Sequence, residues 1–420
     1  MNKRFPWWSV YILGFLGSLA WGVENQYFNT FIYNEITPDP RPISSMVAAS
    51  AVTATLASIF IGALSDRMRH KWGRKPFLLF GYVLWGITTA AFPLSAFVSS
   101  IGIAIVLAIA FDCIMTFFGS SANDSVFHAY VADITTVENR GKVMGVLEIL
   151  TWVAMLVVYG GAGFAIDYLG YYAFFYIIGG LVLVLGLIAG ISLKETSRPS
   201  EPPQGSYFSQ IAGTFRWAVL RANENLLLLF ISITLWGIAQ QVFFPYLIIY
   251  INHNLKKTTT ESSIVIFLAI LIGGIALAYP LGMLVDKWGR KKVALLAILG
   301  EMIGLVLFSL SQSILTLVIT GILWLAPLSA WTIATGAWSK DLYPEDKRGQ
   351  FAGYLILFSV AFTMTIGPMV GSWLTTTFGT QAIINGQNGY IPPALIFQVG
   401  GVATLLAAIP IFMMKKQKVS

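Results

Sequence analysis

Twelve long apolar stretches divide this chain of 420 residues. Each approaches or exceeds the roughly 20 residues that a helix needs to cross a bilayer. Charged residues make up only 11% of the chain, less than half of the roughly 25% typical of a soluble domain, so a large water-facing surface is excluded. The stretches cover residues 8–32, 43–64, 76–97, 101–128, 142–166, 170–192, 226–251, 263–285, 292–311, 314–338, 350–374 and 392–413. This pattern predicts an all-α membrane protein with twelve transmembrane helices.

The longest connection separates the sixth stretch from the seventh. It covers residues 194–225 and includes Ser197-Arg-Pro-Ser-Glu-Pro-Pro203, a composition typical of linkers. We therefore expect an N-terminal six-helix bundle over residues 1–193, a cytoplasmic linker over 194–225 and a C-terminal six-helix bundle over 226–420.

The basic residues indicate how the chain crosses the membrane, because Lys and Arg gather in cytoplasmic loops. If the N-terminus is cytoplasmic, every Lys and Arg except Arg41, Lys256 and Lys257 lies on that side, and none lies in the interior of a stretch. We therefore expect cytoplasmic termini in a cell membrane, and we interpret the net charge of +7 as a topology signal, not as nucleic-acid binding. A signal peptide is the alternative for the N-terminus, but the apolar run continues to Tyr33, too far for such a segment.

Three short sequences recur in the two halves at nearly the same separation. Gly62-Ala-Leu-Ser-Asp66 corresponds to Gly282-Met-Leu-Val-Asp286, Lys71-Trp-Gly-Arg-Lys75 to Lys287-Trp-Gly-Arg-Lys291, and Arg140-Gly141 with Gly145 to Arg348-Gly349 with Gly353. Such self-similarity indicates an internal repeat. Because both halves begin on the same side of the membrane, they form a parallel repeat, which is the architecture of major facilitator transporters.

Two segments carry a more specific resemblance. Ser65-Asp-Arg-Met-Arg-His-Lys-Trp-Gly-Arg-Lys-Pro-Phe77 resembles the loop signature of the major facilitator superfamily, in the form found in glycoside–pentoside–hexuronide:cation symporters and sucrose–proton symporters. Ala122-Asn-Asp-Ser125, followed by His128-Ala-Tyr-Val-Ala-Asp133, is similar to a motif of the sucrose group. The resemblance implies a transporter that works by alternating access and is a monomer, with protons and a small molecule such as a sugar or glycoside as its partners.

The loop signature predicts a gate at the cytoplasmic helix ends. Acidic and basic residues stand a few positions apart there, so charge-assisted pairs can join two helices and break when the helices separate. Glycines permit a tight turn between them. The predicted gating residues are Asp66, Arg67, Gly73 and Arg74 in the first half and Asp286, Gly289 and Arg290 in the second. A solvated loop that serves only topology is the alternative.

Five acidic residues, in contrast to the basic ones, lie within the stretches. They are Glu24, Asp112, Asp124, Glu148 and Glu301. A charged carboxylate at the bilayer centre costs about 2.5–3.5 kcal/mol on an insertion scale, so such residues usually face a partner or a water-filled cavity. A carboxyl group that gains and loses a proton in each cycle is what proton coupling requires. We assign proton coupling to Glu24, Asp112 and Asp124, and expect Glu148 and Glu301 to belong to the loop network.

Polar residues beside these acids form the predicted substrate site. The resemblance places sugar binding at Asp124, and His128 stands where the sucrose group has arginine, which puts sucrose itself in doubt. The second stretch contains no acid, whereas the melibiose branch builds its sodium site there, so protons are favoured over sodium. In stretch seven Pro245 weakens the helix, and in stretch ten an indole can stack on a sugar ring. The predicted substrate-binding residues are Glu24, Asn25, Asn123, Asp124, His128, Gln240, Gln241 and Trp331.

Other classes of protein lack their signatures in this sequence. The sequence contains no Gly-x4-Gly-Lys-Ser/Thr loop, which would indicate an ATP-driven pump. It also contains no catalytic constellation that would indicate an enzyme. One cysteine and three distant histidines predict no metal site and no cofactor. We therefore expect a proton-coupled sugar or glycoside symporter. The alternatives are a proton-driven exporter of drugs or other organic compounds and a non-transporting receptor on the same fold.

Overall fold

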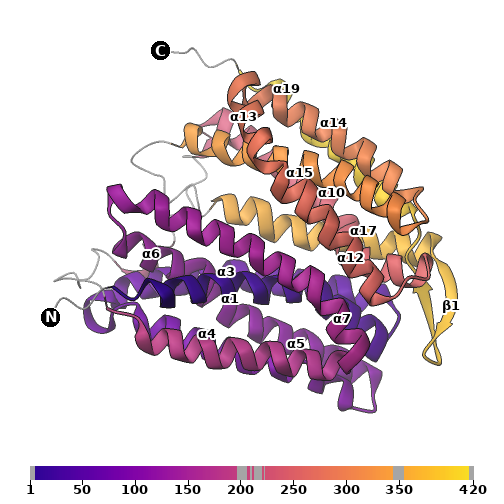
Figure 1. Cartoon of the computed structure of the whole chain (residues 1–420), viewed down its shortest axis with the longest axis horizontal. Coiled ribbons are helices and arrows are strands. Elements are labelled where there is room, and N and C mark those ends of the chain that lie inside the picture. Colours follow the sequence, from indigo (N-terminus) through magenta and orange to yellow (C-terminus); the bar gives the residue numbers. More distant parts are fainter. Residues whose placement is uncertain are drawn as a thin grey trace. The chain divides into compact units, whose positions relative to one another are not determined.

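A computed structural model describes residues 5–195, 206–208, 211, 220–221, 223–343 and 354–415. These residues form two compact units, Met1–Thr37 with Ala49–Gly213, and Pro38–Ala48 with Thr214–Ser420. Figure 1 shows that both units consist mainly of helices. The predicted linker 194–225 lies largely outside the described residues.

The first unit begins with a helix that changes its winding. α1 (Trp7–Val23) continues through the π-helical segment η1 (Glu24–Phe28), α2 (Asn29–Phe31) and a second π segment, η2 (Ile32–Ile36). The elements that follow are α3 (Pro40–Trp72), α4 (Lys75–Ala91), η3 (Phe92–Phe97), α5 (Ile101–Gly119), η4 (Ser120–Phe127), α6 (His128–Ile134) and α7 (Val137–Ser192). The first residues of α3, as far as Ala48, are counted with the second unit. α7 contains two of the predicted stretches. A bend at Gly170, whose φ is 82°, separates them. α1 and α4 both pack against α7.

The second unit has a similar plan with one addition. Its elements are α10 (Glu224–Phe243), η5 (Phe244–Tyr246), α11 (Leu247–Ile249), η6 (Tyr250–Asn254), α12 (Thr259–Ala269), η7 (Ile270–Ala276), α13 (Ala278–Trp288), α14 (Arg290–Ser309), α15 (Ile314–Leu342), η9 (Leu357–Ala361), α17 (Phe362–Phe378), β1 (Thr380–Ile384), β2 (Gln387–Ile391), α18 (Leu395–Thr404), η10 (Leu405–Ala407) and α19 (Ala408–Met413). Pro245 ends α10 in a 3₁₀ turn, as its missing N–H predicts. The antiparallel hairpin pairs Thr380 with Ile391 and Ile384 with Gln387.

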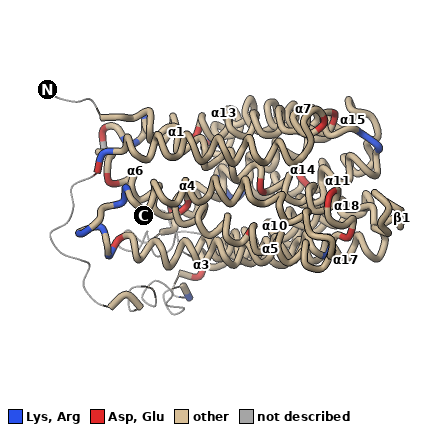
Figure 2. The backbone as a smooth tube through the Cα atoms, turned by 90° about the horizontal axis from the view of Figure 1, so that it is seen from below, with Lys and Arg blue, Asp and Glu red and all other residues tan. Residues whose placement is uncertain are grey.

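The predicted all-α membrane class is confirmed. Ten helices among the described residues are long and apolar enough to cross a membrane, and one of them is α7, which contains two predicted stretches. The first predicted stretch is not one of these ten helices, and η1 and η2 interrupt it. Figure 2 shows Lys and Arg mostly at helix ends, whereas the helix interiors are almost free of them and include some acidic positions.

Aromatic side chains fill much of each interior. In the first unit Phe28 stacks on Phe92 with ring centroids 3.7 Å apart, and Phe31 meets Phe175 edge to face at 5.5 Å. These rings come from η1, α2, η3 and α7 and so fix the end of the first helix against the others. This packing holds the π segment η1, and with it Glu24, in place.

Candidate functional site

Four of the predicted binding residues lie in two π-helical segments of the first unit. Glu24 and Asn25 belong to η1, and Asn123 and Asp124 belong to η4. π segments inside α-helices are rare and often coincide with functional sites. The amino-acid types pointed to these residues, but nothing in the sequence indicated the change of winding.

Glu24 and Asp112 form a buried carboxyl pair. The two carboxyl groups lie close enough for their charges to interact, and Ser50 lies beside Asp112. Glu24 Oε1 accepts a hydrogen bond of 3.0 Å from Thr116 Oγ1. Glu24 is 9% exposed and Asp112 1%. Two carboxylates buried side by side repel each other, so a proton bound to either group relieves that repulsion. The pair, built from η1 and α5, is therefore a candidate proton-binding site.

Asp124 lies next to this pair, surrounded by hydrogen-bond donors. Its Oδ1 accepts from Trp21 Nε1 at 3.1 Å and from Asn123 Nδ2 at 3.2 Å. Asn123 Oδ1 in turn accepts from Tyr82 Oη at 2.9 Å. A Cβ on Gly17 would lie 2.1 Å from Asn123 Oδ1, so only glycine lets α1 approach this network. The arrangement fixes the carboxylate of Asp124, beside which Ser120 also lies.

Two predicted residues of this unit are directed elsewhere. Asn25 Nδ2 donates to the carbonyl of Trp21 on its own helix at 2.8 Å. His128 is exposed at the start of α6, and within the described chain no hydrogen bond joins it to Asp124. The structure thus brings together Glu24, Asp112, Asn123 and Asp124, but not His128.

A second buried acid, Glu301, organises the predicted residues of the other unit. Trp236 Nε1 donates to its Oε2 at 2.7 Å, and Gln240 Nε2 donates to its Oε1 at 2.5 Å. The Trp236 ring stacks on Trp331, with centroids 5.4 Å apart and planes 24° apart. Glu301 is 0% exposed, so it does not join the loop network where the sequence analysis placed it. Gln241, next to Gln240, makes no side-chain hydrogen bond to a described residue.

Glu301 can be tested by its two partners. We expect Glu301→Leu to lower the free energy of unfolding by about 1–3 kcal/mol for each donor left unsatisfied. Glu301→Gln is expected to stay close to wild type, because Gln240 can reverse its amide and both bonds are then retained. Thermal unfolding followed by tryptophan fluorescence measures both variants. A glutamine variant as unstable as the leucine variant would show that the charge, and not the hydrogen bonding, is required.

The first copy of the repeated loop is a buried ionic network around Arg74. Its guanidinium donates to Asp66 at 2.7 Å, to Asp133 at 2.7 Å and to Ser65 at 2.9 Å, and Arg69 pairs with Asp133 at 3.1 Å. The Arg74 side chain is 6% exposed. Burial by itself would lower the pKa of Arg74, but the bonds to Asp133 and Asp66 hold that pKa above its ordinary value, so the charge is retained.

Gly73 lets this network close around a further acid that the sequence analysis missed. Glu195 accepts from the backbone N–H groups of Arg74 at 3.1 Å and Lys75 at 3.3 Å. A Cβ on Gly73 would lie 2.0 Å from the Glu195 carboxyl carbon, and the φ of Gly73 is +72°. Both the space and the conformation therefore require glycine. Asp133 was visible in the quoted motif, whereas Glu195 carried no signal in the sequence.

The second copy has the same five residues but different contacts. Arg290 pairs with Asp341, and both side chains are about 40% exposed. Gly289 again has a positive φ, +84°. Asp286 has no hydrogen bond or ion pair with a described residue. The repeated sequence at Arg348-Gly349 lies outside the described residues.

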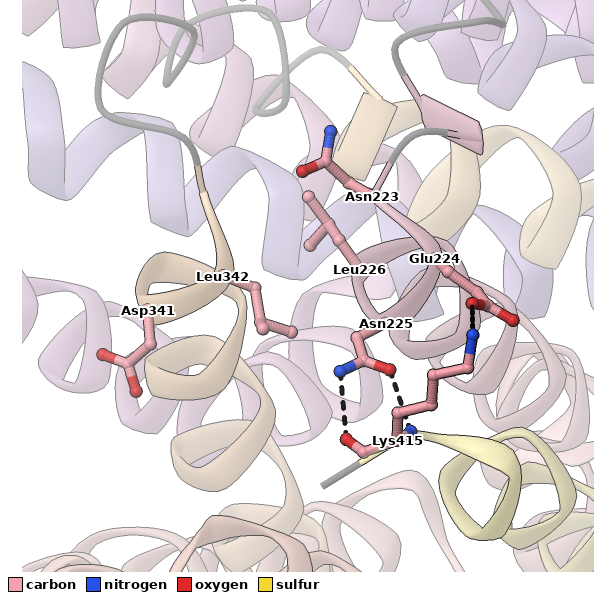
Figure 3. A pocket seen from close by; sticks show the side chains of 7 residues that line it. All are labelled: Asn223, Glu224, Asn225, Leu226, Asp341, Leu342 and Lys415. Atoms are coloured by element: carbon pink, nitrogen blue, oxygen red, sulfur yellow. Dashed lines mark hydrogen bonds and ion pairs between the residues drawn. The ribbon is translucent and has the colours of Figure 1, made fainter. Parts of the chain in front are cut away.

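A small hollow of about 320 Å³ lies in the second unit where α10 begins (Figure 3). Lys415 Nζ pairs there with Glu224 at 2.6 Å, and the backbone of Lys415 exchanges two hydrogen bonds with the side chain of Asn225. These polar groups satisfy one another and hold Lys415 against the start of α10. The hollow is therefore not the candidate site.

Membrane-length helices with carboxyl groups held in their interiors define a multi-pass membrane protein. The chain belongs to the Major Facilitator Superfamily, whose family model matches residues 10–279 and, in a second match, residues 230–419. The predicted fold of twelve transmembrane helices in two parallel halves is thereby confirmed. The protein is a membrane transporter and not an enzyme.

Relatives of known name fall into different substrate classes. Multidrug resistance protein 2 of Bacillus subtilis is 23% identical over 282 residues, which is 67% of each chain. The nucleoside transporter NupG superposes with a TM-score of 0.69 at 17% identity, over 100% of both chains. A D-xylose–proton symporter superposes with a TM-score of 0.68 at 16% identity, over 96% of this chain and 97% of the other. At these identities the two structures establish the fold alone.

Proposed function

We propose that this transporter is a proton-coupled symporter of a sugar or glycoside, as in the branch that the two motifs resemble. One observation supports this most: the Glu24–Asp112 pair adjoins Asp124, whose carboxylate is held by Trp21 and Asn123. The carboxyl pair can bind a proton, and the carboxylate of Asp124 can accept a hydrogen bond from a hydroxylated solute. The matched relatives are compatible with this proposal, since one of the superposed structures is a sugar–proton symporter.

Proximity supplies the coupling in this proposal. Asp124 lies close enough to Glu24 for their charges to interact. Binding of a proton by the Glu24–Asp112 pair removes a negative charge beside Asp124 and so changes how Asp124 binds a donor. By linkage, substrate binding at Asp124 changes the proton affinity of the pair to the same extent. Substrate and proton then favour the same conformational transitions.

Uptake by proteoliposomes tests the proposal. The purified full chain is given labelled mono- and disaccharides with an acidic outside. We expect accumulation that needs the pH gradient and is lost in Asp124→Asn, because an amide presents a donor where the carboxylate offers only acceptors. Uptake that ignores the gradient would contradict proton coupling, and the absence of uptake of every sugar would contradict the substrate class.

A second candidate function is proton-driven export of drugs or other organic compounds. The relative named Multidrug resistance protein 2 favours it, as does the presence of acids without basic residues in the helix interiors. Everted membrane vesicles loaded with cationic or neutral dyes distinguish the two functions. Proton-driven dye movement together with no sugar uptake would replace the first proposal by this one.

The remaining assignments belong to the same proposal. We place both termini in the cytoplasm, the chain in a cell membrane as a monomer, and the halves at 1–193 and 226–420 on either side of the linker 194–225. The second half contributes Gln240, Gln241 and Trp331 to substrate binding. The gates are Asp66, Arg67, Gly73 and Arg74 in one loop and Asp286, Gly289 and Arg290 in the other. The ion pairs of Arg74 and Arg290 support this assignment.

A further inference from the structure

An apolar groove of about 640 Å³ lies in the first unit between α3, α4 and α5. Trp72 from α3, Phe80 and Leu84 from α4, and Phe117 from α5 line it. The side chains are well exposed, with Trp72 at 56% and Phe80 at 63%. The volume is within the range of roughly 300–1,000 Å³ typical of small-molecule sites. The groove therefore has room for a ligand and an apolar wall to hold it.

A single basic residue marks one end of the groove. Lys71 belongs to its lining and lies at the end of α3, next to Trp72. From this end the groove follows α4 from Pro76 to Leu84, about 12 Å along the helix at 1.5 Å per residue. Tryptophan and lysine are typical of the membrane surface, and phenylalanine and leucine of its interior. A cationic end with an apolar floor below it is complementary to a negatively charged amphiphile.

The second copy of the loop surrounds its tryptophan differently. There the tryptophan is Trp288, and Lys292 Nζ lies over its ring, 5.1 Å from the centroid. The residue in the corresponding place of the first copy is Pro76, which has no charge and lines the groove together with Trp72. The same Lys-Trp-Gly-Arg-Lys sequence thus accompanies an apolar groove in one half and a covered tryptophan in the other.

We propose that this groove binds one anionic phospholipid, with the headgroup at Lys71 and an acyl chain along Trp72, Phe80 and Leu84. The chain spans a membrane, and the basic helix ends are those we place in the cytoplasm, where anionic lipids attract Lys and Arg. Basic pockets between transmembrane helices on that side are known to bind such headgroups. This site is separate from Glu24, Asp112 and Asp124, and its occupant is not the transported solute.

Native mass spectrometry of the full chain in detergent tests the proposal with dioleoyl phosphatidylglycerol and dioleoyl phosphatidylcholine as probes. We expect one phosphatidylglycerol to be retained in preference to phosphatidylcholine. Lys71→Gln is expected to weaken that retention about fivefold, which is the effect of one basic residue near a charged surface. Lys287→Gln is the matched control, since it removes the same charge from the second copy, and it is expected to change nothing.

A second variant separates the acyl chain from the headgroup. Phe80→Ala removes an exposed wall of the groove and is expected to weaken retention of the dioleoyl lipid, but not of dihexanoyl phosphatidylglycerol. Equal retention of the two dioleoyl lipids, or equal losses from Lys71→Gln and Lys287→Gln, would overturn the proposal. Both measurements detect binding without transport, so their outcome does not depend on the substrate or on proton coupling.

Discussion

Glu24→Gln is expected to abolish proton-driven accumulation and to leave a folded transporter. A glutamine cannot give up a proton, so the pair with Asp112 loses one of its two titratable groups and the repulsion between them that a bound proton relieves. With one proton per substrate, a gradient of one pH unit supports about tenfold accumulation, because one pH unit corresponds to about 1.4 kcal/mol. The ratio of internal to external substrate should fall from about tenfold to about one, measured at steady state in proteoliposomes.

Glu148→Gln is the matched control for this prediction. Glu148 also lies within an apolar stretch, but it is exposed, and among the described residues its one hydrogen-bond donor is Trp152 on its own helix, at 3.1 Å. We expect this variant to accumulate substrate like wild type. Substrate exchange between the two sides, which needs no gradient, should continue in Glu24→Gln and shows that the variant is folded. Accumulation that persists in Glu24→Gln would exclude Glu24 from the coupling.

Arg74→Ala is expected to cause the largest loss of stability of any single change in the loops. It leaves Asp133 without its 2.7 Å partner and removes the link to Asp66 and Ser65. Breaking a buried ion pair by removing one partner costs about 3–5 kcal/mol. Asp66 is 56% exposed and can be hydrated, and Asp133 keeps its pair with Arg69 at 3.1 Å, so we expect the loss to lie at the lower end of that range. The midpoint of thermal unfolding in detergent measures it.

The second copy of the loop provides the comparison. Arg290 occupies the same position in the repeat, but its pair with Asp341 is about 40% exposed on both sides. Exposed ion pairs contribute about 0–1 kcal/mol, so Arg290→Ala should barely move the midpoint. Similar effects of the two substitutions would contradict the different roles that burial assigns to them.

The helices and their repeat could be predicted from the sequence because both depend on local patterns. Apolar runs of membrane length predict helices whatever their neighbours are, and identical short sequences in both halves predict a repeat. The hairpin around Asn385 and Gly386 was missed although a signal was present. Asn-Gly is a preferred sequence for a two-residue turn with positive φ at both positions, and the observed φ values are 49° and 79°.

The role of Glu301 could not be predicted, because it depends on partners that are distant in the sequence. Trp236, its indole donor, is 65 residues away. The sequence shows an acid near a loop, which suggested an ionic network, but the depth of burial and the direction of the side chain follow from helix packing. The same limit applies to Glu195, which reaches the backbone of Arg74 121 residues away. Residue type indicated where acids matter, but not which contacts they make.

The π segment η1 has a consequence for the direction in which its side chains point. Each residue turns an α-helix by 100°, so one additional residue in a turn rotates all that follows by about that angle. α1 packs against α7 on one side of η1, and the aromatic rings of Phe28 and Phe31 pack on the other. The extra residue therefore lets Glu24 point in a direction around the helix axis that the packing of the flanking segments does not fix. Deleting one residue within Glu24–Phe28 would leave a regular helix, but with its acidic face turned to a different neighbour.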